Sequence, residues 1–195
     1  NVERNPLAKG GVQAAIINNW IANPGRRAMH HALNAGEWGS HPHVSSRLAV
    51  AGNVMELGPD SRPDISLVNN SSGPLELYLK DNLAVNHDHQ PAPLTAGTFT
   101  RLDQAPLWPE GLTLLPAEKV KDYVAKNAGA RPWDRDPIDQ RIVRAALAGA
   151  GKIINSEQEA GGYPIRPATS APFKPEDWNL ETLTPLRPPG QKAGL

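Results

Sequence analysis

The stretch LAVAGNVMEL, residues 48–57, joins two short apolar runs through a corner of glycine and asparagine. The same arrangement occurs in AAIINNWIAN (14–23) and in LELYLKDNLAVN (75–86). Short apolar runs that end at asparagine or glycine are typical of β-strands separated by turns. The three stretches therefore indicate a weak internal repeat built from strand, corner and strand.

The corner asparagines recur about thirty residues apart, a period that is typical of stacked solenoid units. They are Asn18 or Asn19, Asn53 and Asn82. Asparagine tolerates left-handed backbone angles, and its amide can hydrogen-bond to an equivalent amide one coil away. Because a single coil cannot bury its own apolar side, we expect the coils to stack as a parallel β-helix over residues 1–104. An antiparallel sandwich with asparagine-rich turns is the alternative fold at this point.

Residues 105–164 lack the strand-and-corner pattern, and their spacing of apolar residues predicts two short amphipathic helices. In PAEKVKDYVAKNAG, Pro116 suits a first helical position and Gly129 a stop. In DPIDQRIVRAALAGAG, Asp136 suits an N-cap before Pro137, with Ile138, Ile142 and Ala146 on one face. We expect both helices to pack on the solenoid, where covering elements protect an open end. The proline-rich segment 165–195 has few apolar anchors, and we expect it to run as an extended tail.

The composition limits the partners of the chain. Its 195 residues carry 20 basic and 20 acidic side chains, so no strong net charge attracts nucleic acid or anionic lipid. There is no cysteine, which excludes disulfides, thiolate metal sites and a cysteine nucleophile. No apolar run has the length needed to span a bilayer. No signal peptide is visible and the chain does not begin with Met, so we expect a mature product or a fragment of a larger fold. As a separate expectation, the protein is a monomer.

Two segments resemble the pectate lyase family. RNPLAKGG (4–11), followed by an apolar run that ends in paired asparagines, resembles the Arg-x-Pro-x-x-Arg-Gly-Gly strand of that family. The stretch DPIDQRIVRAALAGAGKIINSEQEAGGYP (136–164) is similar to the carboxy-terminal segment of bacterial and fungal pectate lyase-like proteins. The two matches occur in the family's order, and with the coils between them they cover roughly the first 164 residues.

This resemblance implies a right-handed parallel β-helix that cleaves pectate or a related polyuronate by β-elimination. It implies Arg4 as the base and Lys9 as the ligand of the substrate carboxylate, although the family usually has an arginine at the second position. Lysine keeps the charge but loses the planar fork that holds a carboxylate at two points. The resemblance also implies a secreted or periplasmic enzyme that uses Ca²⁺, with the calcium ligands upstream. The chain would then be the carboxy-terminal part of the enzyme.

Other side chains are candidates for binding an acidic sugar chain. Arg26, Arg27 and His30, in NPGRRAMHH, lie beside the expected groove and would attract anions. Stacking of the arginines on a neighbouring coil is an equally simple role. Trp38, in a polar loop, is the better candidate for stacking on a sugar ring, because Trp20 lies within an apolar run typical of a core.

The polar loops 36–46 and 58–64 are expected to project from the sides of the coils. His41-x-His43 and His87-x-His89 have a spacing that a transition metal could use, but their polar, proline-containing surroundings favour ordinary loop histidines. Asp134 and Asp136 could form a carboxylate pair for hydrolysis, and capping is the simpler role. No motif for nucleotide binding, zinc proteolysis or serine hydrolysis occurs.

The sequence therefore predicts a polysaccharide lyase. Two other classes remain open: a non-catalytic β-helix that binds acidic polysaccharide, and a purely structural solenoid. The three differ in whether an unsaturated product forms and whether the basic side chains affect affinity.

Overall fold

The computed structural model describes residues 2–163, 165 and 173–186. The chain divides into two compact units, residues 1–154 and 155–195. The first unit is a parallel β-solenoid with two short helices. The prediction of stacked parallel coils is confirmed, and the antiparallel sandwich is wrong, because every strand pair in the three sheets of this unit is parallel.

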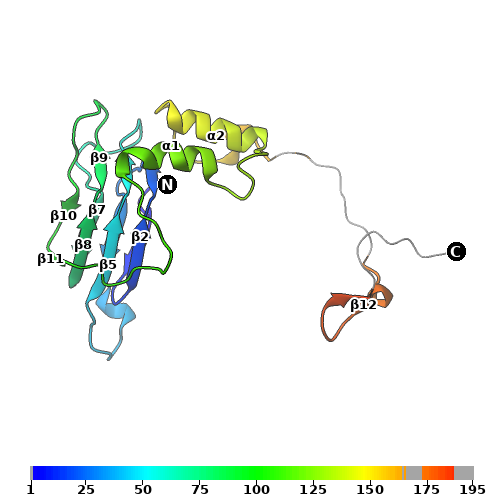
Figure 1. The fold of residues 1–195 in the computed structure, drawn as a ribbon, viewed down its shortest axis with the longest axis horizontal. Coiled ribbons are helices and arrows are strands. Elements are labelled where there is room, and N and C mark those ends of the chain that lie inside the picture. The colour runs from blue at the N-terminus through cyan, green and yellow to red at the C-terminus, as the bar shows by residue number, and fades with distance from the viewer. Residues whose placement is uncertain (1, 164, 166–172, 187–195) are drawn as a thin grey trace. The chain divides into compact units, whose positions relative to one another are not determined.

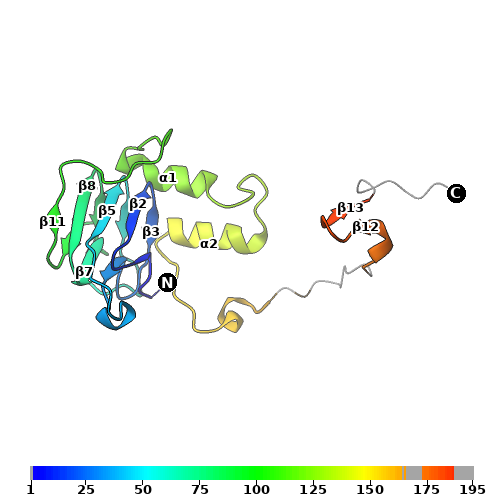
Figure 2. The same ribbon diagram turned by 90° about the horizontal axis from the view of Figure 1, so that it is seen from below.

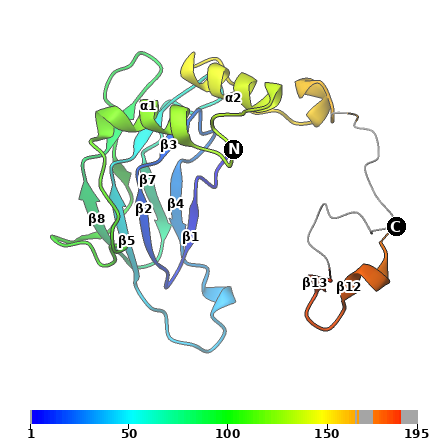
Figure 3. The ribbon, with the colours of Figure 1, turned by 45° about the vertical axis from the view of Figure 1, so that its right-hand side comes forward.

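The strands alternate among three sheets as the chain winds (Figures 1 and 3). The first sheet has the order β1-β4-β7-β10, from strands Leu7–Lys9, Met29–Ala32, Val68–Ser72 and Thr95–Ala96. The second has the order β11-β8-β5-β2, from Thr100–Arg101, Leu75–Lys80, Ser46–Ala51 and Gln13–Ile17. The third has the order β3-β6-β9, from Trp20–Ala22, Val54–Glu56 and Leu83–Val85.

The predicted asparagine corners lie between the second and third sheets and form a ladder. Asn19 donates from Nδ2 to Oδ1 of Asn53 over 2.9 Å, and Asn53 donates from Nδ2 to Oδ1 of Asn82 over 3.0 Å. Asn18 has a positive φ of 57°, as the left-handed corner requires. The spacing that favoured a solenoid is therefore explained by direct amide contacts between coils.

The core lies between the three sheets. Its largest fully buried side chains include Leu48, Met55, Leu67 and Leu77. Strand alternation points Leu48, Met55 and Leu77 inward, and Leu67 lies directly ahead of β7. All four pack in one apolar cluster. Buried His31 is part of this interior and joins three strands, because its ring nitrogens lie 2.7 Å from Asn70 Oδ1 and 2.8 Å from Ser46 Oγ.

Helix α1 (Ala117–Asn127) packs on the solenoid as predicted, but it covers a side rather than an end. Helix α1 lies beside the third sheet (Figures 1 and 2). Its Val120 packs with Trp20 and Val54 of that sheet. Pro116 is the N-cap residue, so the prediction that it takes the first helical position is wrong. The segment ahead of α1 is fixed by Asn18, whose Oδ1 accepts from Leu115 N and whose Nδ2 donates to Thr113 O. The first residue of α1, Ala117, donates from its N–H to Asp81 Oδ2.

Helix α2 (Pro137–Leu147) begins as predicted, since Asp136 accepts hydrogen bonds from the N–H groups of Ile138 and Asp139 ahead of a first-turn proline. Its predicted packing is wrong. No residue of α2 is buried, and Ile142 is 57% exposed. The apolar face that suggested packing on the solenoid is therefore largely open to solvent.

The described part of the second unit contains two 3-10 helices, Glu157–Ala160 and Pro175–Asp177. Strands β12 (Trp178–Asn179) and β13 (Thr184–Pro185) pair antiparallel as a short hairpin. The extended tail predicted for 165–195 is thus replaced by local turns at 175–185, while 166–172 and 187–195 lie outside the described residues.

Candidate functional site

The chain enters the first sheet through a short irregular segment that carries Arg4. Asn5 fixes this segment to the next coil, because its N–H donates to Ala28 O over 3.3 Å and its Nδ2 donates to Arg27 O over 3.0 Å. The Asn5–Pro6 peptide bond is cis, and strand β1 begins only at Leu7. Arg4 therefore precedes the strand, and its side chain is exposed.

The outer face of the first sheet is polar. In β1 and β4, Ala8, Met29 and His31 are buried, so strand alternation turns Lys9 and His30 outward. His30 lies in register with Leu7 and with Asn69 on neighbouring coils. Its Nε2 is 2.8 Å from Ser71 Oγ, and Ser71 donates to Asn69 Oδ1. We call the outward side chains Arg4, Lys9, Arg26, Arg27 and His30 the basic face.

Four members of the basic face gather at the start of β1 and β4. Glu3 lies between two of them, with its Oε2 3.0 Å from Arg26 Nη2 and 3.4 Å from Arg27 Nη1. Burial of the imidazole, followed by the charge of Arg27 and to a smaller extent that of Arg4, lowers the pKa of His30. At this end the structure therefore brings Arg4, Arg26, Arg27 and His30 together, with Glu3 as a counter-charge.

Lys9 and Trp38 form a second group at the other end of β1. Lys9 is ion-paired to Glu37, which belongs to the 3-10 helix Ala35–Glu37 in the loop after β4. This loop projects beyond the strands of the sheet (Figure 3). The hydrogen bond from Lys9 lowers the pKa of the Glu37 carboxyl. The loop is thus held against the strand that carries the predicted carboxylate ligand.

The indole of Trp38 lies over a glycine. A Cβ added at Gly11 would come within 2.7 Å of the Trp38 ring, and Gly11 itself has a positive φ of 78°. Trp38 also meets His43 edge to face, at 5.6 Å between ring centroids. The ring is therefore held by its own loop and by the Gly10–Gly11 turn, which leaves it only partly exposed.

The two groups are close enough to contact one extended ligand. His30 is in register with Leu7, and Lys9 lies two residues further along the same strand. That step is about 7 Å at the usual rise of a β-strand. One anionic chain laid along β1 can therefore meet His30 and Lys9 together, while Arg26 and Arg27 stay with Glu3.

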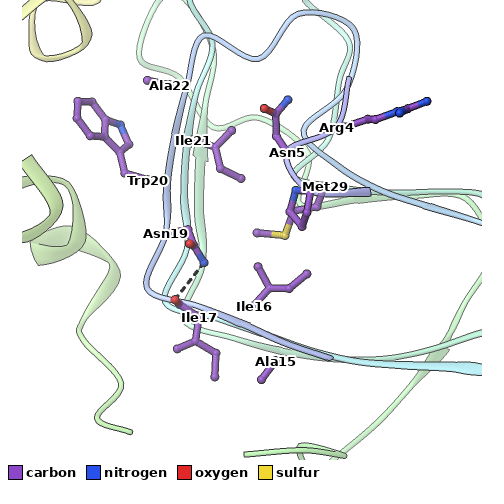
Figure 4. A pocket seen from close by; sticks show the side chains of 11 residues that line it. Arg4, Asn5, Ala15, Ile16, Ile17, Asn19, Trp20, Ile21, Ala22 and Met29 are labelled. Carbon is purple, nitrogen blue, oxygen red and sulfur yellow. Dashed lines mark hydrogen bonds between the residues drawn. The ribbon is translucent and has the colours of Figure 1, made fainter. Parts of the chain in front are cut away.

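A cavity of about 620 Å³ lies beside Arg4, but most of the residues that line it are of apolar type. Figure 4 shows Ile16, Ile21 and Met29 around the cavity, while the guanidinium of Arg4 points away from it. Ile16 and Ile21 are side chains of the first coil, and Met29 belongs to the second. The cavity is therefore the open end of the solenoid core and not a pocket for an anionic sugar.

Two of the remaining histidines, His43 and His87, have side-chain contacts. His87 lies with its Nε2 2.7 Å from Gly58 O, and His89 occupies a left-handed turn with a φ of 57°. Among the described residues there is no cluster of three or more His, Asp or Glu side chains that could hold a metal ion. No described helix is long and apolar enough to cross a membrane.

Sequence reasoning missed the acidic partners of the basic face. Glu3 and Glu37 lie far in sequence from Arg27 and Lys9, and only the register of the coils brings each pair together. Glu3 lies directly before Arg4 in the motif, but nothing in the sequence places it beside residues 26 and 27. The hydrogen bonds that link His30 to Ser71 and Ser71 to Asn69 could not be predicted for the same reason, since β4 and β7 belong to different coils.

Comparisons with known proteins add no relative. No protein-family model matches the chain, and neither a curated protein nor a solved structure matches it. The fold and the contacts of the basic face are therefore the observations on which a function has to rest.

Proposed function

We propose that the chain is part of a secreted or periplasmic polysaccharide lyase of the pectate lyase type, with a right-handed β-helix and a polyuronate substrate. The observation that carries the proposal is the basic face, in which Arg4, Arg27 and His30 gather beside the outer surface of a parallel sheet. The asparagine ladder and the sequence RNPLAKGG (4–11) give further support. An exposed sheet face with cations along its edge suits a long anionic polymer.

In the proposed reaction the substrate carboxylate must first be neutralised. The proton at C5 of a uronate is only weakly acidic while the neighbouring carboxylate carries its full charge. Lys9 and His30, about 7 Å apart along the strand direction, are the side chains that would contact consecutive carboxylates of the polymer. Such contacts stabilise the negative charge that develops when the proton leaves.

Arg4 is the proposed base. A neutral guanidine takes the proton from C5, the electron pair of that bond forms the C4–C5 double bond, and the C4–O bond breaks. The leaving oxygen takes a proton from solvent. Arginine is ordinarily protonated in water, so neighbouring positive charge is needed to favour the neutral form. The position of Arg4 ahead of β1, near the positive charge of Arg27, supports this assignment.

Calcium, which the resemblance implies, does not fit the described residues. Glu3 is bound to Arg26 and Arg27, and Glu37 is bound to Lys9, so the acidic side chains nearest the basic face are already neutralised. A calcium ion prefers several carboxylate and carbonyl oxygens around one centre. The described acidic side chains therefore do not form a calcium site.

The same ion pairs favour a second candidate, a non-catalytic module that binds acidic polysaccharide. A side chain held by a carboxylate must exchange that partner to bind substrate, which suits reversible binding as well as catalysis. This candidate needs only the charge of the basic face. It does not need Arg4 to lose a proton.

Ultraviolet absorbance of polygalacturonate separates the two candidates. The lyase predicts a growing absorbance from the unsaturated uronate with the unaltered chain and with Arg141→Ala, a control on exposed helix α2, and no signal with Arg4→Ala. Calcium and chelator arms show whether a metal contributes. If polygalacturonate binds in a pull-down with no absorbance in any arm, the lyase is wrong and the binding module is supported.

A further inference from the structure

The first sheet has an irregularity beside His30. Strands β4 and β7 pair in parallel, but the register skips one residue of β7, because His31 pairs with Asn70 and Ala32 pairs with Ser72. Ser71 is therefore the extra residue of a β-bulge. Bulges of this kind re-aim a side chain. Here the exposed side chain of Ser71 reaches back to the preceding pair of the ladder, with its Oγ 2.8 Å from His30 Nε2.

The hydrogen bonds at this bulge determine which nitrogen of His30 carries a proton. Ser71 has one hydroxyl proton and donates it to Asn69 Oδ1 over 2.8 Å. Its oxygen can then only accept at the contact with His30, so Nε2 of the ring is the donor. In a neutral imidazole the other nitrogen, Nδ1, holds the lone pair. No group in the described part of the chain hydrogen-bonds to this Nδ1.

The surroundings of the ring favour its neutral form in the free chain. Burial of the imidazole, followed by the charge of Arg27, lowers the pKa of His30 below the ordinary 6.5. His31 and Arg4 act in the same direction, and Glu3 opposes them. A carboxylate that approaches the ring reverses this balance, because negative charge favours the protonated form. The proton must then enter at Nδ1, since Nε2 already carries one.

We propose that Asn69 and Ser71 are positioning residues, which hold the proton of neutral His30 on Nε2 so that Nδ1 takes up a proton and donates it in a hydrogen bond to a carboxylate of a bound polyuronate. This inference rests on the proposed function, in that the basic face binds such a polymer. The proton comes from solvent, and no covalent bond of the polymer changes in this step. The charged hydrogen bond that results is stronger than one between neutral groups.

Nitrogen-15 NMR of the histidine rings, without polymer and well above pH 6.5, tests the assigned tautomer. The averaged shift of each ring nitrogen reports how often that nitrogen is protonated. The exposed ring of His41 serves as a reference for histidine without fixed partners. We expect Nε2 of His30 to be protonated more often than Nε2 of His41. Ser71→Ala should bring His30 to the mixture that His41 shows.

Three further variants separate the hydroxyl from its orientation. Asn69→Ala frees the hydroxyl of Ser71 to donate to Nε2, so Nε2 of His30 should be protonated as rarely as in Ser71→Ala, or more rarely. Ser71→Thr keeps a hydroxyl and should keep the proton on Nε2. The matched control is Ser72→Ala, in the same strand, because the Ser72 hydroxyl donates to Leu33 O and not to the ring. This control should give the spectrum of the unaltered chain.

Addition of polygalacturonate tests the contact at Nδ1. The shift of His30 Nδ1 should move to that of a protonated nitrogen, while Nε2 stays protonated. Ser71→Ala should bind the polymer about threefold more weakly than the unaltered chain, a fold-change typical of one lost hydrogen bond. Ser72→Ala should bind with unchanged affinity.

Two outcomes would overturn the proposal. Equal tautomer mixtures of His30 in the unaltered chain and in Ser71→Ala would show that the bulge does not set the tautomer. Polymer binding that leaves the Nδ1 shift unmoved would exclude the carboxylate contact. Failure of the proposed function is distinguishable, because the unaltered chain would then bind no polymer while His30 keeps its proton on Nε2. That result would overturn the carboxylate contact and support the tautomer assignment.

Discussion

Asn19 and Asn53 are joined by two hydrogen bonds that cross from one coil to the next, from N and Nδ2 of Asn19 to the single Oδ1 of Asn53. Asn53 is fully buried and also donates to Ile16 O and Ala51 O. One side chain thus satisfies polar groups on two coils at a corner where backbone would otherwise be buried without partners. This contact fixes the register of the second and third sheets.

Replacing Asn53 should therefore be costly. Asn53→Ala leaves buried donors and acceptors of both coils unsatisfied, and each such group costs about 1–3 kcal/mol. We expect the free energy of unfolding to fall by about 3 kcal/mol or more, measured by chemical denaturation. Asn86→Ala, in a turn after β9, is the control and should cost about 1 kcal/mol. Equal losses in the two variants would contradict a special role for the ladder.

Removing the charge of Glu3 should strengthen binding of polygalacturonate. Glu3→Gln frees Arg26 and Arg27 from their shared carboxylate, so we expect the Kd to fall about two- to fivefold in low salt, measured by titration. Exposed ion pairs stabilise proteins by at most about 1 kcal/mol, so unfolding should change little. The control is Glu76→Gln, which breaks the Arg47–Glu76 pair on the second sheet. An equal gain there would show a non-specific charge effect.

Binding of the polymer should depend on the protonation of His30. Burial and Arg27 lower its pKa from the ordinary 6.5, so the folded chain favours the neutral ring. The stability from this shift is present above pH 6.5 and is lost as the pH falls through the lowered pKa.

A bound polyanion favours the protonated ring and opposes that shift. The affinity should therefore rise as the pH falls through the pKa of His30, by at most about tenfold per pH unit. The groups that act on the ring are Arg27, Glu3, His31 and Arg4. His30→Gln should flatten this part of the pH profile, and an unchanged profile in that variant would exclude His30 from the binding surface.

Asp60 should control the attachment of the segment around Ile153. Its Oδ2 accepts from Asn23 Nδ2 over 2.8 Å and from Ile153 N over 2.7 Å, and these bonds lower its pKa below the ordinary 3.8. The stabilisation is present above pH 3.8 and is lost as the pH falls through the lowered pKa. We expect Asp60→Asn to speed hydrogen exchange at the Ile153 amide at neutral pH. Asp64→Asn should leave that amide unchanged, and similar exchange in the two variants would contradict the assignment.

The sequence predicts the solenoid well because its signal is local and repeated. Asn53 and the apolar runs beside it form one short segment, so the strand, the corner and the direction of the next strand can be inferred together. Asp136 and Pro137 likewise predict the start of helix α2 from two adjacent residues. The packing of α2 is not local, because the solvent exposure of Ile142 depends on where the helix lies.

The site is less predictable because its contacts also join residues that lie far apart in the sequence. RNPLAKGG (4–11) draws attention to Arg4 and Lys9, but the partners of the basic face come from other coils and loops. Glu37 meets Lys9 because the loop after β4 folds back on the Gly10–Gly11 turn. The loop's path depends on Gly11, because only a glycine leaves room there for the Trp38 ring. No pattern in the sequence predicts this contact.

Mass analysis of the products from polygalacturonate tests the central claim most directly, since β-elimination and hydrolysis differ by one water. We expect oligomers with one unsaturated end, each lighter by one water than the matching hydrolysis product. They should form with the unaltered chain and with Arg141→Ala, and be absent with Arg4→Ala. Products of full hydrolytic mass, or unsaturated products that persist in Arg4→Ala, would contradict Arg4 as the base of a lyase.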